Sequence, residues 1–275
     1  MTVLAATDLD RTLVHSDRVA GPAEAHEVIR LERRRGVTTA SLTRRTAASL
    51  VALDRVATWV PATTRSVDGY RRLDLARTLG VVPRYAVCAN GAVLLVDGVA
   101  DANWAARVRA LIARAAPRRE VARLLTGHLG ALPHGKVRTA DGALLVVRIP
   151  DVPDGWVDGL DALVADRGWR VSAHDEKVHV LPAGLEKSAA VAEIGRRVAA
   201  SRVLAAGDSP LDADLLLAAD AGIQPVDGRL HAAGWHADHV AVTAAAGLRA
   251  GEEIAAWLLA QAVAFRPGVS SAGDR

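Results

Sequence analysis

The feature that most constrains the fold of this chain is a short apolar segment, residues 3–7, that ends in two aspartates, Asp8 and Asp10. An extended backbone places these two carboxylates on the same side. In open α/β sheets, functional side chains lie at the carboxyl ends of strands. Two neighbouring carboxylates repel each other unless a cation or a proton lies between them, and Mg²⁺ prefers such oxygen ligands. The segment therefore predicts a buried strand with a candidate metal site at its end, and the alternative is a solvated acidic turn.

The bulk composition limits the classes to which the protein can belong. The chain has 275 residues, of which 51% are hydrophobic, enough for a large domain with a smaller one attached. No apolar run reaches the ~18–20 residues that cross a bilayer, and we see no signal peptide. Cys88 is the single cysteine, which excludes an intrachain disulfide and a thiolate metal cluster. We therefore expect a cytoplasmic protein that does not bind membranes.

The charge balance gives weak support for a nucleic-acid partner, and we do not expect one. The net charge is only +3, and the basic residues are spread along the chain rather than clustered with aromatic residues. The one dense cluster, Arg33–Arg35, precedes Gly36 and is interpreted as the turn of a hairpin over residues 26–42. Only three of the 34 basic residues are lysines, so a lysine beside a motif is more informative than an arginine.

Apolar segments and helical patterns alternate over residues 1–95 and 174–265. This alternation predicts an α/β fold whose core is a doubly wound parallel, Rossmann-like sheet. The predicted strands after the first are residues 59–62, 85–89, 177–181, 203–206 and 240–242. The predicted helices are residues 43–56, 68–79, 187–200, 211–218 and 251–264.

Residues 96–173 differ in character and are predicted to form a smaller inserted α/β domain. An Arg/Ala-rich helix pair over about 101–130 precedes a strand at 143–149, a helix at 154–167 and a strand at 169–173. Four prolines punctuate the segment. The last ten residues, 266–275, are rich in Pro, Gly and Ser, which predicts a disordered tail.

Residues with side chains suited to catalysis lie at the ends or starts of four of these predicted elements. They are the acid pair, Thr63, Lys187 at a helix start, and the run Gly207–Asp212, which directly follows the strand at 203–206. Phosphoryl transfer requires such a set: a carboxylate nucleophile, a second carboxylate for proton transfer, a hydroxyl donor, a fixed ammonium and acids that hold a metal ion.

At these four points the chain resembles the haloacid dehalogenase (HAD) superfamily of phosphatases, over about residues 1–95 and 176–262. Asp8-Leu9-Asp10-Arg11-Thr12 is similar to the family's first motif, with Arg11 where glycine is commoner. The resemblance implies that Asp8 is the nucleophile and a Mg²⁺ ligand. It implies that Asp10 is the general acid/base and also a metal ligand.

The second motif of the family, Thr-Gly-Arg, is matched imperfectly at two places. Thr63-Thr64-Arg65 follows an apolar strand, whereas Thr43-Arg44-Arg45 stands where a helix should begin. We prefer Thr63 as the catalytic hydroxyl, with Thr64 and Arg65 as substrate-binding residues. Thr43 remains the alternative and is otherwise a helix cap.

The third and fourth motifs are matched near the end of the chain. Lys187 is similar to the third-motif lysine, and Lys177 is its rival. Gly207-Asp208-Ser-Pro-Leu-Asp212 resembles the fourth motif, which implies that Asp208 binds Mg²⁺. Asp212 either binds the metal or supports the site through neighbouring groups.

The inserted domain falls between the second and third motifs, as in the Cof-type and sucrose-phosphatase-like branch of the family, where it forms a cap. The Asn90-Gly91-Ala92 run also resembles that branch, which implies a substrate-binding role for Asn90. The resemblance implies a Mg²⁺-dependent phosphatase that acts on a small phosphorylated metabolite, plausibly a sugar phosphate, through an aspartyl-phosphate.

Other functions remain open at this stage. A sugar phosphomutase shares the acid pair, and a weakly catalytic binding or regulatory protein would fit the substituted motif positions, Arg11, Thr64 and Leu211. Three histidines near residues 231–239 are interpreted as solvated loop residues rather than a metal site. The sequence predicts neither the particular substrate nor the oligomeric state.

Overall fold

The centre of the molecule is a five-stranded parallel sheet. The structure is a computed structural model that describes residues 2–21, 27–174 and 176–265. All neighbouring strands in this sheet pair in parallel. Their order is β14 (Val240–Val242), β13 (Ala221–Gln224), β12 (Ala200–Ala206), β1 (Thr2–Thr7), β4 (Thr58–Pro61). The predicted Rossmann-like core is confirmed.

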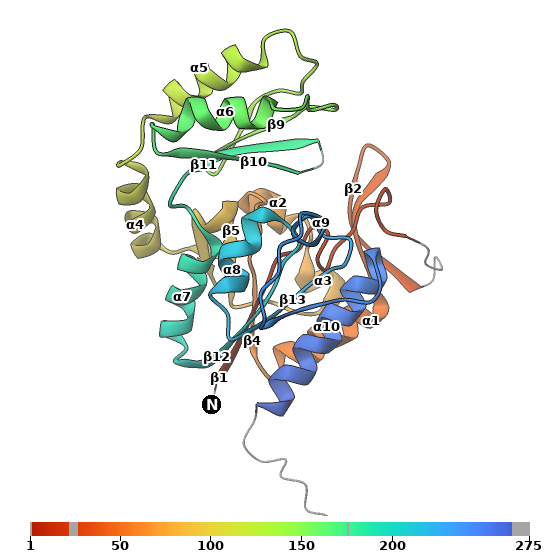
Figure 1. Ribbon diagram of the computed structural model, residues 1–275. Coiled ribbons are helices and arrows are strands. Elements are labelled where there is room, and N and C mark those ends of the chain that lie inside the picture. The colour runs from red at the N-terminus through yellow and green to blue at the C-terminus, as the bar shows by residue number, and fades with distance from the viewer. Residues whose placement is uncertain (1, 22–26, 175, 266–275) are drawn as a thin grey trace, which may run out of the picture.

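Helices cover both faces of this sheet (Figure 1). Side chains of β1 alternate between two separate apolar clusters: Val3 and Ala5 pack in one, Leu4 and Ala6 in the other. The first cluster includes α1 (Arg44–Asp54) and α10 (Gly247–Ala264), and the second includes α7 (Lys187–Arg197) and α8 (Ala213–Leu217). This two-sided burial explains why the strand is an almost uninterrupted apolar run.

A hairpin of β2 (Val28–Arg34) and β3 (Val37–Thr43) stands beside the sheet. Arg35 and Gly36 form its turn, both with positive φ, which confirms the interpretation of the basic cluster. Thr43 ends β3 and caps α1, because its hydroxyl accepts a hydrogen bond from the Thr46 amide.

Residues between the core strands form a second small sheet, β5 (Tyr85–Cys88), β6 (Val93–Val96) and β7 (Val99–Ala100), which is antiparallel. A parallel bridge from Ala62 to Val87 joins it to the end of β4. The helix predicted over 68–79 is divided into α2 (Val67–Arg71) and α3 (Leu75–Leu79), because Asp74 has a positive φ. Strands β6, β7 and β13 were not predicted.

The inserted unit is a four-stranded antiparallel sheet with two helices on one face. The strand order is β10 (Trp169–His174), β11 (Lys177–Pro182), β9 (Leu144–Arg148), β8 (Arg138–Ala140). Helices α5 (Arg118–Leu129) and α6 (Trp156–Ala165) share an apolar cluster with this sheet. We call these six elements the cap, and Figure 1 shows them above the core.

The cap boundaries differ from the predicted 96–173. Strand β11 was assigned to the core, but it pairs with β9 and β10 and therefore belongs to the cap. Helix α4 (Ala102–Ile112) instead packs on the core, where the Trp104 indole donates a 2.8 Å hydrogen bond to the Gly91 carbonyl. Alternation identifies a strand but does not say which sheet it joins, so this boundary could not be read from the sequence.

Three short helices complete the described elements: η2 (Ala89–Gly91), η3 (Pro210–Asp212) and α9 (Arg229–Ala232). Within the described ranges, no helix combines the length and apolar character that crossing a bilayer requires. The tail predicted for residues 266–275 lies outside the described residues.

Candidate active site

Three neighbouring strands of the parallel sheet deliver the acid and hydroxyl groups. Asp8 follows β1, Asp208 follows β12 by two residues, and Thr63 follows β4 by two residues. Because β12, β1 and β4 are adjacent and parallel, these residues share one edge of the sheet. Strand β1 runs from the N-terminus at the bottom of Figure 1 upward, so this edge faces the cap.

Lys187 is the centre of the site. Its Nζ lies 2.7 Å from Oδ1 of Asp8 and 2.6 Å from Oδ1 of Asp212, and its side chain is completely buried. Burial alone would lower the pKa of Lys187, but the carboxylates of Asp212 and Asp8 raise it above its usual value. Lys187 is therefore a fixed ammonium in contact with the predicted nucleophile, whereas Lys177 lies on the cap.

Three buried carboxylates surround this ammonium. Oxygens of Asp8, Asp208 and Asp212 all lie within 4.8 Å of one another. Burial, together with the neighbouring carboxylates, raises the pKa of Asp208, and burial raises the pKa of Asp8 to about 7. The ammonium of Lys187 and the guanidinium of Arg11, 3.7 Å from Asp208, do not neutralise three carboxylates, so a divalent cation with oxygen ligands fits this donor set.

Asp212 also holds the loop that carries Asp208. Its Oδ2 accepts hydrogen bonds from the Asp208 and Ser209 amides and from the Ser209 hydroxyl, at 2.8–3.2 Å. A side chain at Gly207 would meet the Cβ of Asp212 at 2.3 Å, which explains the glycine before Asp208. With Oδ1 on Lys187, Asp212 is more fully engaged than Asp8 or Asp208, which favours a supporting role over direct metal ligation.

Asp10 does not join the carboxylate cluster. Arg65 donates two parallel hydrogen bonds to the Asp10 carboxylate, from Nε at 2.7 Å and from Nη2 at 2.6 Å. Burial raises the pKa of Asp10, but this guanidinium more than offsets the effect and lowers that pKa to about 2. The predicted metal-ligand role of the Asp10 carboxylate therefore finds no support in this geometry, because both of its oxygens are bonded to Arg65.

The hairpin supplies a residue that sequence analysis missed. Glu32 accepts hydrogen bonds from Arg65 Nη1 at 3.0 Å, from Arg72 Nε at 2.6 Å and from the Thr39 hydroxyl at 3.0 Å. The strand register shifts on both sides of Glu32, and such irregularities redirect side chains. Glu32 thus fixes the far side of the Arg65 guanidinium. In the sequence, the only indication of Glu32 was a glutamate among the arginines of a strand that was expected to be exposed.

The structure separates the two candidate threonines. Thr63 is buried at the end of β4, where its hydroxyl accepts a 3.1 Å hydrogen bond from the Arg65 amide and its own amide bonds the Val87 carbonyl. Thr64 follows on the same loop and is half-buried. Thr43 lies in the hairpin and caps α1. Thr63 therefore shares the sheet edge with Asp8, and Thr43 has a structural task.

This difference predicts opposite outcomes for two matched substitutions. If Thr63 donates its hydroxyl to a transferring phosphoryl group, Thr63→Val should lower the turnover number by the equivalent of about 1–3 kcal/mol. Thr43→Val should cost about 1 kcal/mol of folding stability through the lost cap, with turnover per folded molecule unchanged. Steady-state kinetics and urea unfolding of both variants measure these effects. The reverse pattern would place the second motif at Thr43.

Asn90 connects two parts of the site. Its Nδ2 donates a 2.9 Å hydrogen bond to the Leu185 carbonyl, and its amide bonds the Thr63 carbonyl. A side chain at Gly91 would lie 2.2 Å from the Glu186 carbonyl. The Asn90–Gly91 turn therefore holds the segment before Lys187 against the Thr63 loop. The structure shows this positioning role for Asn90, and the predicted substrate contact stays a proposal.

The residues next to the acid pair also contribute. Arg11 has a φ of +69°, which explains why glycine is the commoner residue there. Its Nε lies 3.7 Å from Oδ2 of Asp208, so the side chain adds positive charge beside the cluster. The Thr12 hydroxyl donates a 3.3 Å hydrogen bond to Oδ2 of Asp8 and helps to fix that carboxylate.

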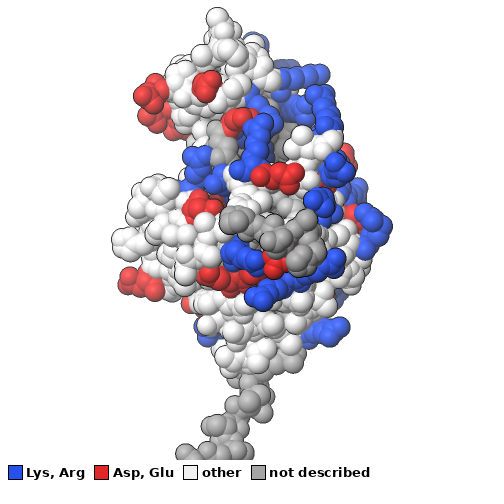
Figure 2. Space-filling view, turned by 90° about the vertical axis from the view of Figure 1, so that its right-hand side faces the viewer, with Lys and Arg blue, Asp and Glu red and all other residues white. Residues whose placement is uncertain are grey.

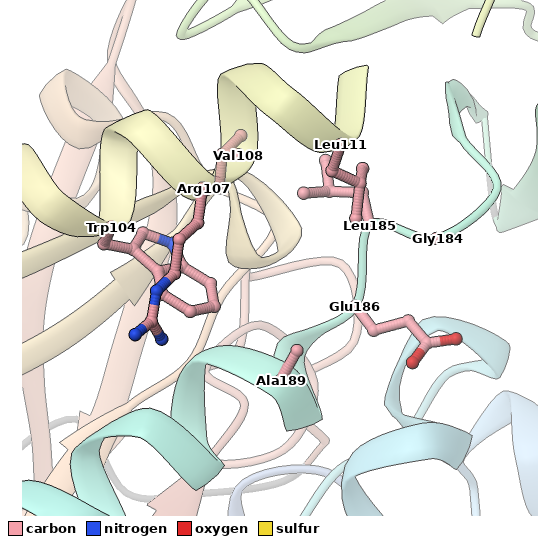
Figure 3. A pocket seen from close by; sticks show the side chains of 8 residues that line it. All are labelled: Trp104, Arg107, Val108, Leu111, Gly184, Leu185, Glu186 and Ala189. Carbon is pink, nitrogen blue, oxygen red and sulfur yellow. The ribbon is translucent and has the colours of Figure 1, made fainter. Parts of the chain in front are cut away.

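A separate cavity of about 140 Å³ lies between α4 and the start of α7 (Figure 3). Trp104, Val108, Leu111 and Leu185 give it an apolar lining. None of the clustered carboxylates lines it, so it is distinct from the carboxylate cluster. No metal-ligand group that includes the histidines at 231–239 occurs among the described residues, and His239 bonds the Leu216 carbonyl.

Comparison by sequence finds neither a matching family model nor a matching curated protein. Comparison by structure finds clear likenesses. The sucrose-phosphatase from Synechocystis sp. PCC6803, solved with sucrose and phosphate, is 16% identical with a TM-score of 0.66, and the match covers 94% of this chain and 97% of that one.

Two further solved structures match over nearly their whole length. A HAD subclass IIB sugar phosphatase is 14% identical with a TM-score of 0.59, over 95% of this chain and 98% of that one. A trehalose-6-phosphate phosphatase related protein is 15% identical with a TM-score of 0.55, over 96% and 100%. The chain therefore has the fold of HAD hydrolases of the sucrose-phosphatase-like branch, as its motifs indicated.

Proposed function

We propose that the protein is a HAD-type phosphatase that hydrolyses a small phosphorylated metabolite, in the class of sugar phosphates, through an aspartyl-phosphate on Asp8. The observation that carries this proposal is the buried contact of Asp8 with Lys187 beside Asp208, at the sheet edge that faces the cap. The structural likeness to a sucrose-phosphatase and to a sugar phosphatase supports the substrate class.

Each residue has a proposed task in the reaction. Asp8 attacks phosphorus and the ester oxygen leaves with a proton from Asp10, after which Asp10 activates water to hydrolyse the acyl phosphate. Lys187 balances the charge of the phosphoryl oxygens and Thr63 orients one of them, with Thr64 and Arg65 contacting substrate. A bound Mg²⁺, held by Asp8 and Asp208, would neutralise further charge on the transferring group.

The ion pair between Asp10 and Arg65 has to open before Asp10 can donate a proton in this mechanism. Asp10 stays ionised while Arg65 holds both of its oxygens, so it is ready to act as a base but not as an acid. A phosphate group is a strong bidentate partner for a guanidinium. We propose that substrate phosphate draws Arg65 away from Asp10 and thereby allows Asp10 to carry the proton that it donates.

Removal of divalent metal is expected to abolish phosphate release, and Mg²⁺ should restore it. Ca²⁺ should restore it poorly, because its longer bonds and looser coordination shell disturb the alignment of nucleophile and leaving group. The measurement is phosphate release after EDTA treatment and re-addition of each metal. Full turnover in the presence of chelator would contradict the assignment of Asp8 and Asp208 as metal ligands.

A panel of phosphorylated metabolites, assayed with Mg²⁺, tests the proposed function itself. Release of inorganic phosphate from members of the panel supports a phosphatase. Conversion of a sugar phosphate to its isomer without phosphate release would identify a mutase instead. Tight binding of phosphorylated compounds with neither reaction would identify a binding protein on the same fold.

A further inference from the structure

The cap sheet has one face turned to its own helices and one turned to the core. On β11, Val178 and Val180 pack in the cluster of α5 and α6, whereas Leu181 packs in a cluster of the core. On β9, Leu145 and Val147 face the helices, and Leu144 faces the core. Because strand residues alternate, Lys177, His179 and Arg148 lie on the core-facing side.

This core-facing side carries polar and basic residues at one end. Lys177 lies directly opposite Arg148 in the register of β11 and β9, and His179 lies opposite Ser172 of β10. The hydroxyl oxygen of Ser172 is buried and has no hydrogen-bond partner among the described residues. A buried hydroxyl of this kind is available to a ligand.

Contacts at both ends of this sheet face hold it over the core, and the Lys177 end lies against the segment that follows the acid pair. Glu176, beside Lys177, forms a 3.0 Å ion pair with Arg18 of the segment that follows the acid pair. At the opposite end of β9, Asp141 in the turn between β8 and β9 accepts a 2.9 Å hydrogen bond from the Val67 amide, two residues after Arg65. The positive charge of Lys177 also contributes to the lowered pKa of Asp10.

The charges at this junction are unevenly matched. One carboxylate, Glu176, serves both Arg18 and Arg148, at 3.0 Å and 3.2 Å. Lys177 has no carboxylate within 4 Å among the described residues. Figure 2 shows Lys and Arg side chains gathered where the cap meets the core, with acidic side chains interspersed among them.

From this geometry we propose that Lys177 and Arg148 form a subsite for a second anionic group, a carboxylate or a phosphate, on the leaving group of the substrate. The proposal rests on the proposed phosphatase function and narrows its substrate class from sugar phosphates in general to phosphorylated sugar acids, phosphorylated hydroxy acids and bisphosphates. An ammonium and a guanidinium side by side suit an anion, whereas a neutral sugar requires donors and acceptors in equal measure.

The test compares matched substrates that differ only in the second anion. The pairs are 6-phosphogluconate with sorbitol 6-phosphate, 3-phosphoglycerate with glycerol 3-phosphate, and fructose 1,6-bisphosphate with fructose 6-phosphate. The first two pairs test a carboxylate, and the third tests a phosphate. We expect kcat/KM to be at least about tenfold higher for the anionic member of one of these pairs.

Lys177→Gln should remove most of this preference by raising KM for the anionic member much more than for its neutral counterpart. The matched control is Arg123→Gln, which removes an exposed basic side chain from α5, on the helix-covered side of the cap sheet, and should leave the preference intact. Equal kinetics for both members of all three pairs, or a preference that survives in Lys177→Gln, would overturn the subsite.

A binding measurement separates this inference from the proposed function. Calorimetry on the Asp8→Asn variant with Mg²⁺ reports affinity for the same compounds without turnover. If no compound is hydrolysed by the unsubstituted protein, the phosphatase proposal fails. The subsite still stands if the anionic member binds more tightly and Lys177→Gln in the Asp8→Asn background abolishes the difference, and it fails if affinities within each pair are equal.

Discussion

Replacement of Asp8 by asparagine is expected to reduce phosphate release at least about 1,000-fold, because the amide oxygen is not a nucleophile. The side chain keeps its shape, but asparagine has a single oxygen. Thr12 and Lys187 donate to different oxygens of Asp8, so only one of them retains its acceptor. Kinetics with the most active substrate of the panel measure the loss. Acid-quench mass spectrometry should detect a phosphorylated peptide that contains Asp8 in the unsubstituted protein and not in the variant. Near-normal turnover by Asp8→Asn would disprove the covalent mechanism.

The same variant should be at least as stable as the unsubstituted protein when no metal is present. Burial, which raises the pKa of Asp8 to about 7, makes the ionised carboxylate unfavourable in the folded state. An acid whose pKa is raised on folding loses stability as pH rises from its ordinary value near 4 to about 7. The advantage of Asp8→Asn should therefore grow over this pH range and vanish at lower pH. Urea unfolding in EDTA at pH 5 and pH 7.5 measures it, and a large loss of stability at pH 7.5 would contradict the argument.

Lys187→Met is expected to damage both turnover and folding. The substitution leaves Asp8 and Asp212 buried without their common partner, and loss of one member of a buried ion pair costs about 3–5 kcal/mol. Phosphate release should fall below detection, since the phosphoryl oxygens lose their fixed ammonium. Denaturant unfolding and phosphate release measure the two effects.

Lys187→Arg distinguishes a catalytic role from a purely structural one. It keeps the positive charge, so the variant should fold better than Lys187→Met, but the planar guanidinium cannot reproduce a compact ammonium in a closed site. We expect low turnover in a folded protein. If Lys187→Arg folds and retains nearly full turnover, Lys187 serves only to balance the buried carboxylates. Lys136→Met is the matched control for loss of a lysine, with both properties unchanged.

The sequence alone determined the parallel core and most of the groups at its edge. Strands that are buried on both faces appear in the sequence as nearly continuous apolar runs. The carboxyl ends of adjacent parallel strands lie at the same edge of the sheet. This pattern, together with the resemblance to the HAD motifs, predicted that Asp8, Thr63 and Asp208 lie together, and the strand order β12, β1, β4 places them at one edge. The scarcity of lysine further directed attention to Lys187, which the structure places against Asp8.

Only the tertiary structure decided which of several similar residues and strands belong together. Alternation marked β11 as a strand, but its pairing with β9 and β10, and hence the place of Lys177 on the cap, depended on long-range contacts. The same holds for Arg65, whose bonds to Asp10 and Glu32 join residues 55 and 33 positions apart. Local sequence pattern reports burial and backbone conformation, whereas the partner of a charged side chain is set by the packing of distant elements.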